Sequence, residues 1–175
     1  MKTKINLKKS LVFSLLFLVF LMSSRSILAK SPDFNLPNPG MLADNPLIFL
    51  KNIKEDIIIF AVRDNEKKAK YYLSLSQRHL SGALILHEKG RADLAIDELR
   101  KSENDFLQSL TTANDILKTG GSISDDLLED MKRLSISHKE VLNYVLSNSK
   151  NTNTVQIAES IDVNVKLQIQ IDDLR

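Results

Sequence analysis

The fold is decided by residues 65–119, NEKKAKYYLSLSQRHLSGALILHEKGRADLAIDELRKSENDFLQSLTTANDILKT. Apolar residues recur at spacings of three and four on both sides of Lys89-Gly90, which is typical of two long amphipathic helices. Gly90 stands where a glycine with positive φ commonly ends a helix. The stretch therefore predicts a long helical hairpin at the centre of the fold.

The second half of this hairpin has the most regular pattern in the chain. Its seam positions follow a seven-residue repeat and are Ala92, Ile96, Leu99, Glu103, Phe106, Leu110, Ala113 and Leu117. All but Glu103 are apolar, which is typical of a seam between nearly parallel helices. The first half has a broader stripe that contains Ala69, Tyr72, Leu73, Ser76, Leu80, Ala83 and Leu84. Two helices alone cannot bury both surfaces, so the hairpin needs further helices.

The segment before the hairpin supplies one of these helices. Asn45-Pro46 is a favourable helix start. One face of the helix that follows carries Leu47, Leu50, Ile53, Ile57, Phe60 and Ala61, and Ile58 and Ile59 widen it. This spacing predicts a first helix that is well buried. Asp64 is expected to cap the first helix of the hairpin.

The segment after Gly120-Gly121 supplies another helix. Ser122 or Ser124 can cap it, and Ser122 to Asp125 has the spacing of a capping box. Its predicted apolar face contains Leu127, Leu128, Met131, Leu134, Val141, Leu142 and Val145. Residues 147–154, SNSKNTNT, predict a polar loop.

Residues 155–174 give conflicting signals. Strict alternation with polar residues, which is typical of a strand, involves Ile161, Val163, Val165, Leu167, Ile169 and Ile171. The sequence has no second strand-like segment to pair with it, and a lone strand would need another molecule. We therefore expect a helix, with an exposed strand that adds to a partner's sheet as the alternative.

Residues 1–29 have the layout of a secretory signal peptide. Basic residues precede the apolar run Leu11–Met22, and Ala29 is a suitable last residue before cleavage. A membrane span takes about 20 apolar residues, and Arg25 follows the run too closely for one. We expect cleavage, with an uncleaved N-terminal anchor as the alternative. Residues 30–44 then form a Pro-rich linker, and residues 45–175 form the helical domain.

Charge and cysteine content exclude several functions. The segment 1–29 holds five of the 24 basic residues and none of the 22 acidic ones, so its removal changes the net charge from +2 to −3. A protein that binds phosphate backbones needs a basic surface, so we expect no nucleic-acid binding. The chain has no cysteine, which excludes disulfides, thiolate metal sites and covalent haem attachment.

The three histidines do not form a metal-binding pair. His79 and His87 are eight residues apart, about 80° around a helix. His138 lies on the apolar side of its helix, so we expect a buried structural histidine. A zinc or haem site assembled across helices is the alternative.

Other catalytic patterns are absent from the sequence. There is no Gly-x-Ser-x-Gly motif and no phosphate-binding loop. Carboxylate pairs are expected at helix starts or on exposed faces, as at Asp97-Glu98, Asp125-Asp126 and Glu129-Asp130. We therefore expect no enzyme, and no catalytic, cofactor-binding or metal-binding residues.

Several short motifs lie between Leu42 and about Leu110. They are Asn45-Pro46-Leu47, Phe49-Leu50-Lys51, Asn65-Glu66-Lys67-Lys68-Ala69 and the Lys89-Gly90 turn. This region resembles a family of exported bacterial all-helical domains of unknown function, although that family usually has Pro where Asn65 stands. The resemblance implies an exported, non-catalytic helical domain and assigns no functional residue.

These observations predict an all-α, mostly antiparallel bundle of four or five helices outside the cytoplasm, secreted or in the cell envelope. The expected role is non-enzymatic binding to an unknown protein partner through helix surfaces. Membrane attachment is expected if the N-terminal segment is retained. The alternative is a carrier that holds a small ligand or a metal in the bundle interior, at His138.

Overall fold

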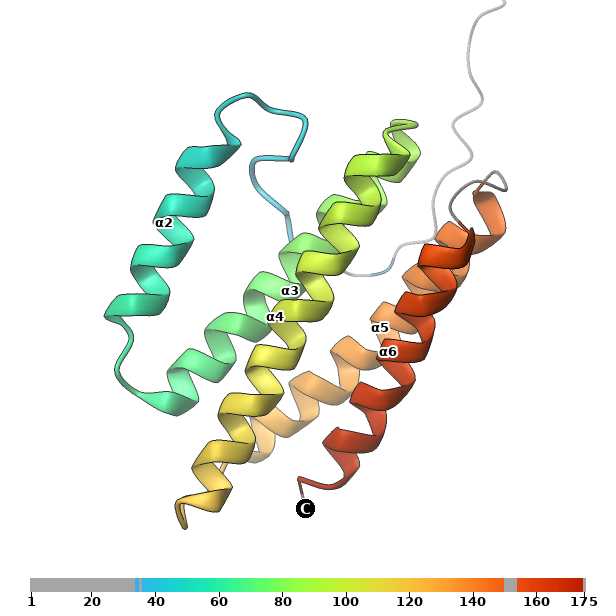
Figure 1. Ribbon diagram of the computed structural model, residues 1–175. Helices are drawn as coiled ribbons and strands as arrows, with labels where there is room; N and C mark the ends of the chain where they lie inside the picture. Colours follow the sequence, from blue (N-terminus) through green and yellow to red (C-terminus); the bar gives the residue numbers. More distant parts are fainter. Residues whose placement is uncertain (1–33, 35, 150–153, 175) are drawn as a thin grey trace, which may run out of the picture. The chain divides into compact units, whose positions relative to one another are not determined.

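The computed structural model describes residues 34, 36–149 and 154–174, so the predicted signal peptide or anchor lies outside the described residues. The described part contains five α-helices and no strand, which confirms the all-α bundle (Figure 1). The helices are α2 (Ile48–Ala61), α3 (Asn65–Glu88), α4 (Ala92–Lys118), α5 (Asp125–Asn148) and α6 (Thr154–Asp172).

The predicted hairpin is formed by α3 and α4, which lie side by side in opposite directions (Figure 1). Gly90 has φ +72°, a conformation that side chains with a Cβ rarely adopt. The seam is confirmed: its residues from Ile96 to Ala113 are all buried, and Ala92 and Leu117 at its ends are half-buried.

Serines bring the two helices of the hairpin close together. The hydroxyl of Ser76 donates to the carbonyl oxygen of Ser102 at 2.7 Å, and the hydroxyl of Ser102 donates to the carbonyl oxygen of Ser76 at 2.6 Å. Ser109 on α4 donates in the same way to the carbonyl of Ala69 on α3, at 2.7 Å. Each of these buried hydroxyls thus has a hydrogen-bond acceptor in the backbone of the opposite helix. The small serine side chains allow the two backbones to come close.

A second hairpin, α5 and α6, packs against the first, with α5 on α3 and α6 on α4 (Figure 1). The cap of α5 is Ser124, whose hydroxyl oxygen accepts from the backbone N–H of Leu127 at 3.3 Å. The predicted capping box is wrong, because Asp125 is already the first residue of the helix. The predicted cap of α3 is confirmed, since Asp64 accepts from the N–H of Lys67.

The ambiguous tail is a helix, as favoured. The buried residues of α6 follow spacings of three and four and are Ile157, Ser160, Asn164, Leu167 and Ile171. Two of these five buried residues, Ser160 and Asn164, are polar, so the helical spacing of apolar residues is interrupted in the sequence and the strand-like alternation is easier to see. The predicted loop 147–154 is too long, because α5 continues to Asn148 and α6 begins at Thr154; residues 150–153 lie outside the described part.

Part of the Pro-rich lead-in packs on the bundle. Phe34 and Leu36 contact the core, and the Phe34 ring meets the Tyr144 ring edge-on at 5.7 Å between centroids. Pro39 is buried near Gly82 of α3. These contacts attach the chain to the bundle before α2 begins.

The main departure from expectation is α2. It begins at Ile48, two residues after the predicted start, and the Asn45 side chain accepts from the N–H of Leu47 outside the helix. The prediction of a well-buried helix is wrong, because most of its apolar side chains are exposed. None of the described helices is long and apolar enough to cross a membrane.

Candidate functional site

Helix α2 buries a carboxylate against the bundle and leaves most of its large apolar side chains exposed to solvent. Within Ile48–Ala61, all of which the structure describes, the only buried residue is Glu55, which is 6% exposed. Five large apolar side chains lie more than half exposed, up to 90% for Phe60; we call them the outer face of α2, and they are Phe49, Leu50, Ile53, Ile57 and Phe60.

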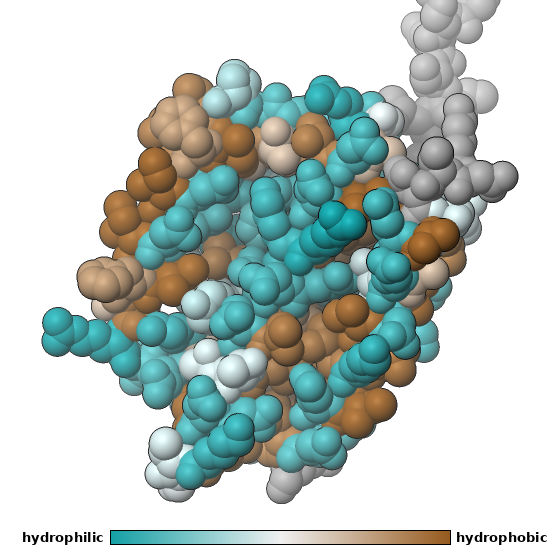
Figure 2. All heavy atoms as spheres, in the orientation of Figure 1, coloured by the Kyte–Doolittle hydropathy of each residue, from teal (hydrophilic) through white to brown (hydrophobic). Residues whose placement is uncertain are grey.

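The outer face is continuous. At 100° per residue its members span an arc of about 100° on the side opposite Glu55, and no charged residue falls within it. Figure 2 shows apolar atoms gathered over α2 at the edge of the view, beside a mostly hydrophilic surface. A contiguous exposed apolar surface of this kind marks an interaction site.

The inner side of α2 is held by long ion pairs. Glu55 Oε1 lies 3.8 Å from Nη1 of Arg78 and 4.0 Å from Nζ of Lys51, and Glu55 Oε2 lies 3.9 Å from Nε2 of His79. These distances exceed those of hydrogen bonds. Three isoleucines of α2 are half-buried on the same side of the helix: Ile48, Ile58 and Ile59. The inner side of α2 therefore combines long ion pairs with apolar side chains, and the outer face is left free.

Glu55 belongs to a cluster of ionisable groups from α2, α3 and α4, which we call the His79 cluster: Glu55, His79, Glu98 and Asp105. His79 Nδ1 donates to Glu98 Oε2 at 2.7 Å, and Lys101 donates to Glu98 Oε1 at 2.7 Å. Burial alone would raise the pKa of Glu98, but these hydrogen bonds outweigh it and lower the pKa to about 2. The expectation of an exposed carboxylate is therefore wrong for Glu98, which is buried.

Asp105 is the least favourably placed member of the cluster. Its Oδ2 lies 3.6 Å from His79 Nε2, at a cavity of about 270 Å³ between α2 and the hairpin. Burial raises the pKa of Asp105 to about 6, and the nearby carboxylates of Glu55 and Glu98 add to the rise. The charged form of Asp105 therefore destabilises the folded protein at neutral pH.

Asp105→Asn should stabilise the fold at pH 8 by roughly 1–3 kcal/mol, since each pKa unit corresponds to about 1.4 kcal/mol. The folded pKa is raised, so the penalty is absent at pH 3, develops as the pH rises from 3.8 to about 6, and is complete above that. Urea unfolding at pH 8 and at pH 4 measures the gain. An equal gain at both values would contradict the assignment to charge burial.

The His79 cluster is occupied with its own ion pairs. Among the described residues, no group of three or more His, Asp or Glu side chains is arranged to hold a metal ion. Within 4 Å of the cluster, Arg78 faces Glu55, Lys101 faces Glu98, and the His79 ring lies between Glu98 and Asp105. The simplest role of the cluster is structural, since it connects α2 to the hairpin.

His138 lies in a different place, fully buried between α3, α4 and α5. Its Nε2 is 2.8 Å from the hydroxyl of Ser102 and 3.3 Å from that of Ser76, and its ring packs on Phe106 at 5.6 Å. Both hydroxyl protons go to backbone carbonyls, so the ring must carry its own proton on Nε2. Nδ1 then has no hydrogen-bond partner among the described residues, and burial lowers the pKa of His138 to about 3.

This arrangement does not activate a nucleophile. In a serine–histidine pair the hydroxyl donates its proton to the imidazole, whereas here the imidazole donates to the hydroxyls. The group is also closed to solvent, since Ser76, Ser102 and His138 are all 0% exposed. His138 is buried, as expected, and among the described residues it belongs to no group of three or more His, Asp or Glu side chains that could hold a metal ion.

The third histidine, His87, is half-buried at the end of α3, where its ring lies 6.2 Å from that of Tyr144. Burial lowers the pKa of His87. The three histidines thus occupy three separate environments.

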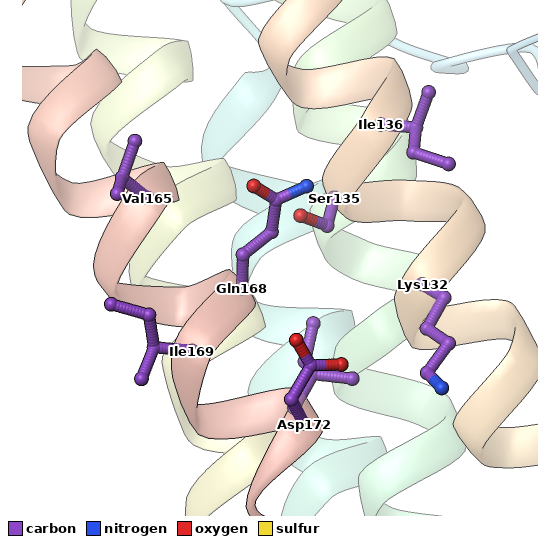
Figure 3. A pocket seen from close by; sticks show the side chains of 8 residues that line it. Lys132, Ser135, Ile136, Val165, Gln168, Ile169 and Asp172 are labelled. Atoms are coloured by element: carbon purple, nitrogen blue, oxygen red, sulfur yellow. The ribbon is translucent and has the colours of Figure 1, made fainter.

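A groove of about 430 Å³ runs between α5 and α6 on the outside of the bundle. Figure 3 shows Ser135 of α5 and Gln168 of α6 on facing sides of it, with Ile136, Val165 and Ile169 around them. The hydroxyl of Ser135 is buried and has no hydrogen-bond partner in the structure. The groove is the second candidate binding surface.

Sequence reasoning missed most of these placements. Glu55, Glu98 and Asp105 come from two helices, and nothing in their local spacing indicates that they meet. The serines left a weak signal, because Ser76 interrupts an otherwise apolar stripe.

No protein-family model, curated protein or solved structure matches this chain. Its candidate sites are therefore assigned from their geometry alone.

Proposed function

We propose that this chain is an exported, non-enzymatic helical module that acts by surface binding through the outer face of α2. The observation that carries the proposal is that α2 exposes its apolar face to solvent. Five large apolar side chains point to solvent while its only buried side chain is a carboxylate. Leaving such residues exposed forgoes about 1.5–3 kcal/mol for each side chain that could be fully buried.

Two further observations support a binding role over catalysis. The buried serine–histidine group has the wrong hydrogen-bond polarity for a nucleophile. The His79 cluster is internally paired and opens on a cavity of about 270 Å³, slightly below the usual 300–1,000 Å³ of small-molecule sites. Export rests on the signal-like layout of residues 1–29.

A photo-reactive amino acid at position 57 of the full chain tests this proposal in the cells that export it. We expect a discrete cross-linked product from Ile57, because its side chain is 61% exposed at the centre of the outer face. The matched control is the same substitution at Glu129, which is exposed on the polar side of α5. Identical patterns from the two positions would refute binding through α2.

The alternative function is a small-ligand carrier, and the groove between α5 and α6 favours it. A ligand with an apolar body could contact Ile136 and Ile169 and form a hydrogen bond with the Gln168 side chain that lines the groove. Non-denaturing mass spectrometry of the purified protein would reveal a retained molecule. Loss of that molecule in Ile169→Arg, with retention in Leu107→Arg outside this groove, would support the carrier function.

A further inference from the structure

We infer that the outer face of α2 inserts into the interfacial region of a lipid bilayer, so that α2 lies flat between the membrane and the bundle. This inference rests on the proposed function and names the partner of the same surface. Interfacial helices have one apolar face, carry aromatic and branched aliphatic residues on it, and turn their charged side away from the lipid. In α2 no charged residue lies on the outer face, and Glu55 is turned toward Arg78 of the hairpin.

The width of the face disfavours a single partner helix. A seam for one partner helix uses two positions in seven and is narrow, whereas a stripe of about 100° is the width that a helix buries against a broad apolar surface. The outer face has this broader width, with Phe49 at one edge and Leu50 at the other. Around the helix axis, Lys54 lies about 40° beyond Leu50 and Asp56 lies about 20° beyond Phe49, so charged residues border the face on both sides.

The position of the face favours a flat partner. In Figure 1, α2 lies at the edge of the described part, and Figure 2 shows its apolar side chains at that edge. The face protrudes, because Phe60 is 90% exposed. A planar membrane surface can reach a protruding helix without any complementary groove.

The size of the face disfavours a second copy of the chain. A stable protein interface uses about 20–30 residues on each side, and the outer face supplies five large side chains. Insertion into lipid needs no matching surface, and its strength follows the apolar area buried.

Charge and chain connectivity add two arguments. The α2 segment has two lysines and two acidic residues, so its net charge is zero and it has no attraction for anionic lipids in particular. Zwitterionic lipid should therefore suffice. The apolar run Leu11–Met22 ends 12 residues before Phe34, which packs on the bundle, and an extended chain of that length reaches up to about 40 Å. If this run is retained in a membrane, the bundle that carries α2 stays close to the same membrane.

A fluorophore at position 57 tests the inference in the full chain. The sequence has no cysteine, so Ile57→Cys provides a single site for a polarity-sensitive dye such as NBD. With phosphatidylcholine vesicles we expect a blue shift and quenching by nitroxide groups placed high on the acyl chains. Glu129→Cys, labelled in the same way, should show neither. Because the readout is local to α2, vesicle binding by the N-terminal segment alone cannot produce it.

A pair of charge variants sharpens the test. Ile53→Asp, in the centre of the outer face, should reduce the apparent vesicle affinity reported by the dye at least about tenfold. Lys54→Asp adds the same side chain one residue away, beyond the face, and should change it less than about twofold. Circular dichroism should show parent-like helicity for both, because both positions are exposed.

Two results would overturn the inference. One is the absence of a blue shift at position 57 with vesicles. The other is a blue shift without vesicles together with a doubled mass in light scattering, which would identify a second copy as the occupant. If vesicles give no shift but the photo-reactive residue at position 57 still captures a protein, the proposed function stands and only the bilayer assignment fails.

Discussion

Phe106→Asp is expected to abolish the cooperative unfolding transition of this protein. Phe106 is 0% exposed, and its ring packs on that of His138 at 5.6 Å. Truncation of a buried phenylalanine alone costs about 3–5 kcal/mol, and an unpaired buried carboxylate adds a further penalty. Domains of this size are stable by about 5–15 kcal/mol in total. The substitution therefore removes most or all of the stability, which circular dichroism during urea or thermal unfolding would show.

The matched control is Leu107→Asp, the same change one residue further along α4. Leu107 is outside the seam and 41% exposed, so the loss should be much smaller and the transition should stay cooperative. Charge reversal at Lys67 and Lys68 on the outer side of α3 should also leave the helicity intact. A cooperative melt of Phe106→Asp near the temperature of the parent would show that the seam is assigned wrongly.

The seam could be predicted because its information is local. Positions Ile96 to Ala113 repeat along one helix, and an apolar face that continues over several turns must be covered. The turn at Gly90 could be predicted as well, since a glycine between two periodic segments indicates a turn with positive φ. The helical state of α6 followed from the absence of a pairing strand in the sequence.

The orientation of α2 could not be predicted. Its period correctly places Leu50, Ile53, Ile57 and Phe60 on one face, but a period does not say what covers that face. The assumption that apolar faces turn inward failed because Glu55 finds Arg78 and His79 on α3. These partners lie more than 20 residues away in the sequence, so the competition between the two orientations is decided by tertiary contacts.

The buried polar groups were partly predictable. His138 was expected to be buried, since its neighbours at helical spacing are apolar, and it is. Its hydrogen-bond partners were not, because Ser76 and Ser102 come from two other helices. The same limit applies to Glu98, where an exposed face was expected and a buried ion pair is found.

His138→Gln should remove a strong pH dependence of stability. The pKa of His138 is lowered to about 3 by burial, so the folded protein keeps the ring neutral while the unfolded chain takes up a proton below pH 6.5. The contribution of His138 is therefore complete above pH 6.5 and lost as the pH falls toward 3. Each pH unit in this window corresponds to about 1.4 kcal/mol, or roughly 5 kcal/mol over the whole window.

The quantity to measure is the difference in unfolding free energy between the parent and His138→Gln, by urea titration from pH 7 downward. Glu98 loses stability as the pH falls below 4.5, and Asp105 gains it as the pH falls from about 6 to 3.8. Both groups are present in the two proteins, so their effects cancel in the difference. His87→Gln is the control, and it should give a smaller pH-dependent difference because His87 is only half-buried.

The pH dependence of this difference in unfolding free energy tests the hydrogen bonds around the His138 ring. Ser76 and Ser102 have given their protons to backbone carbonyls, so they can accept only one proton from the imidazole, the one on Nε2. A second proton would have to sit on Nδ1, which has no acceptor. If the difference between parent and variant stays constant from pH 7 to pH 5, the folded protein must protonate His138 as easily as the unfolded chain does. Nδ1 would then have an acceptor, and the closed serine–histidine group between α3, α4 and α5 would be assigned wrongly.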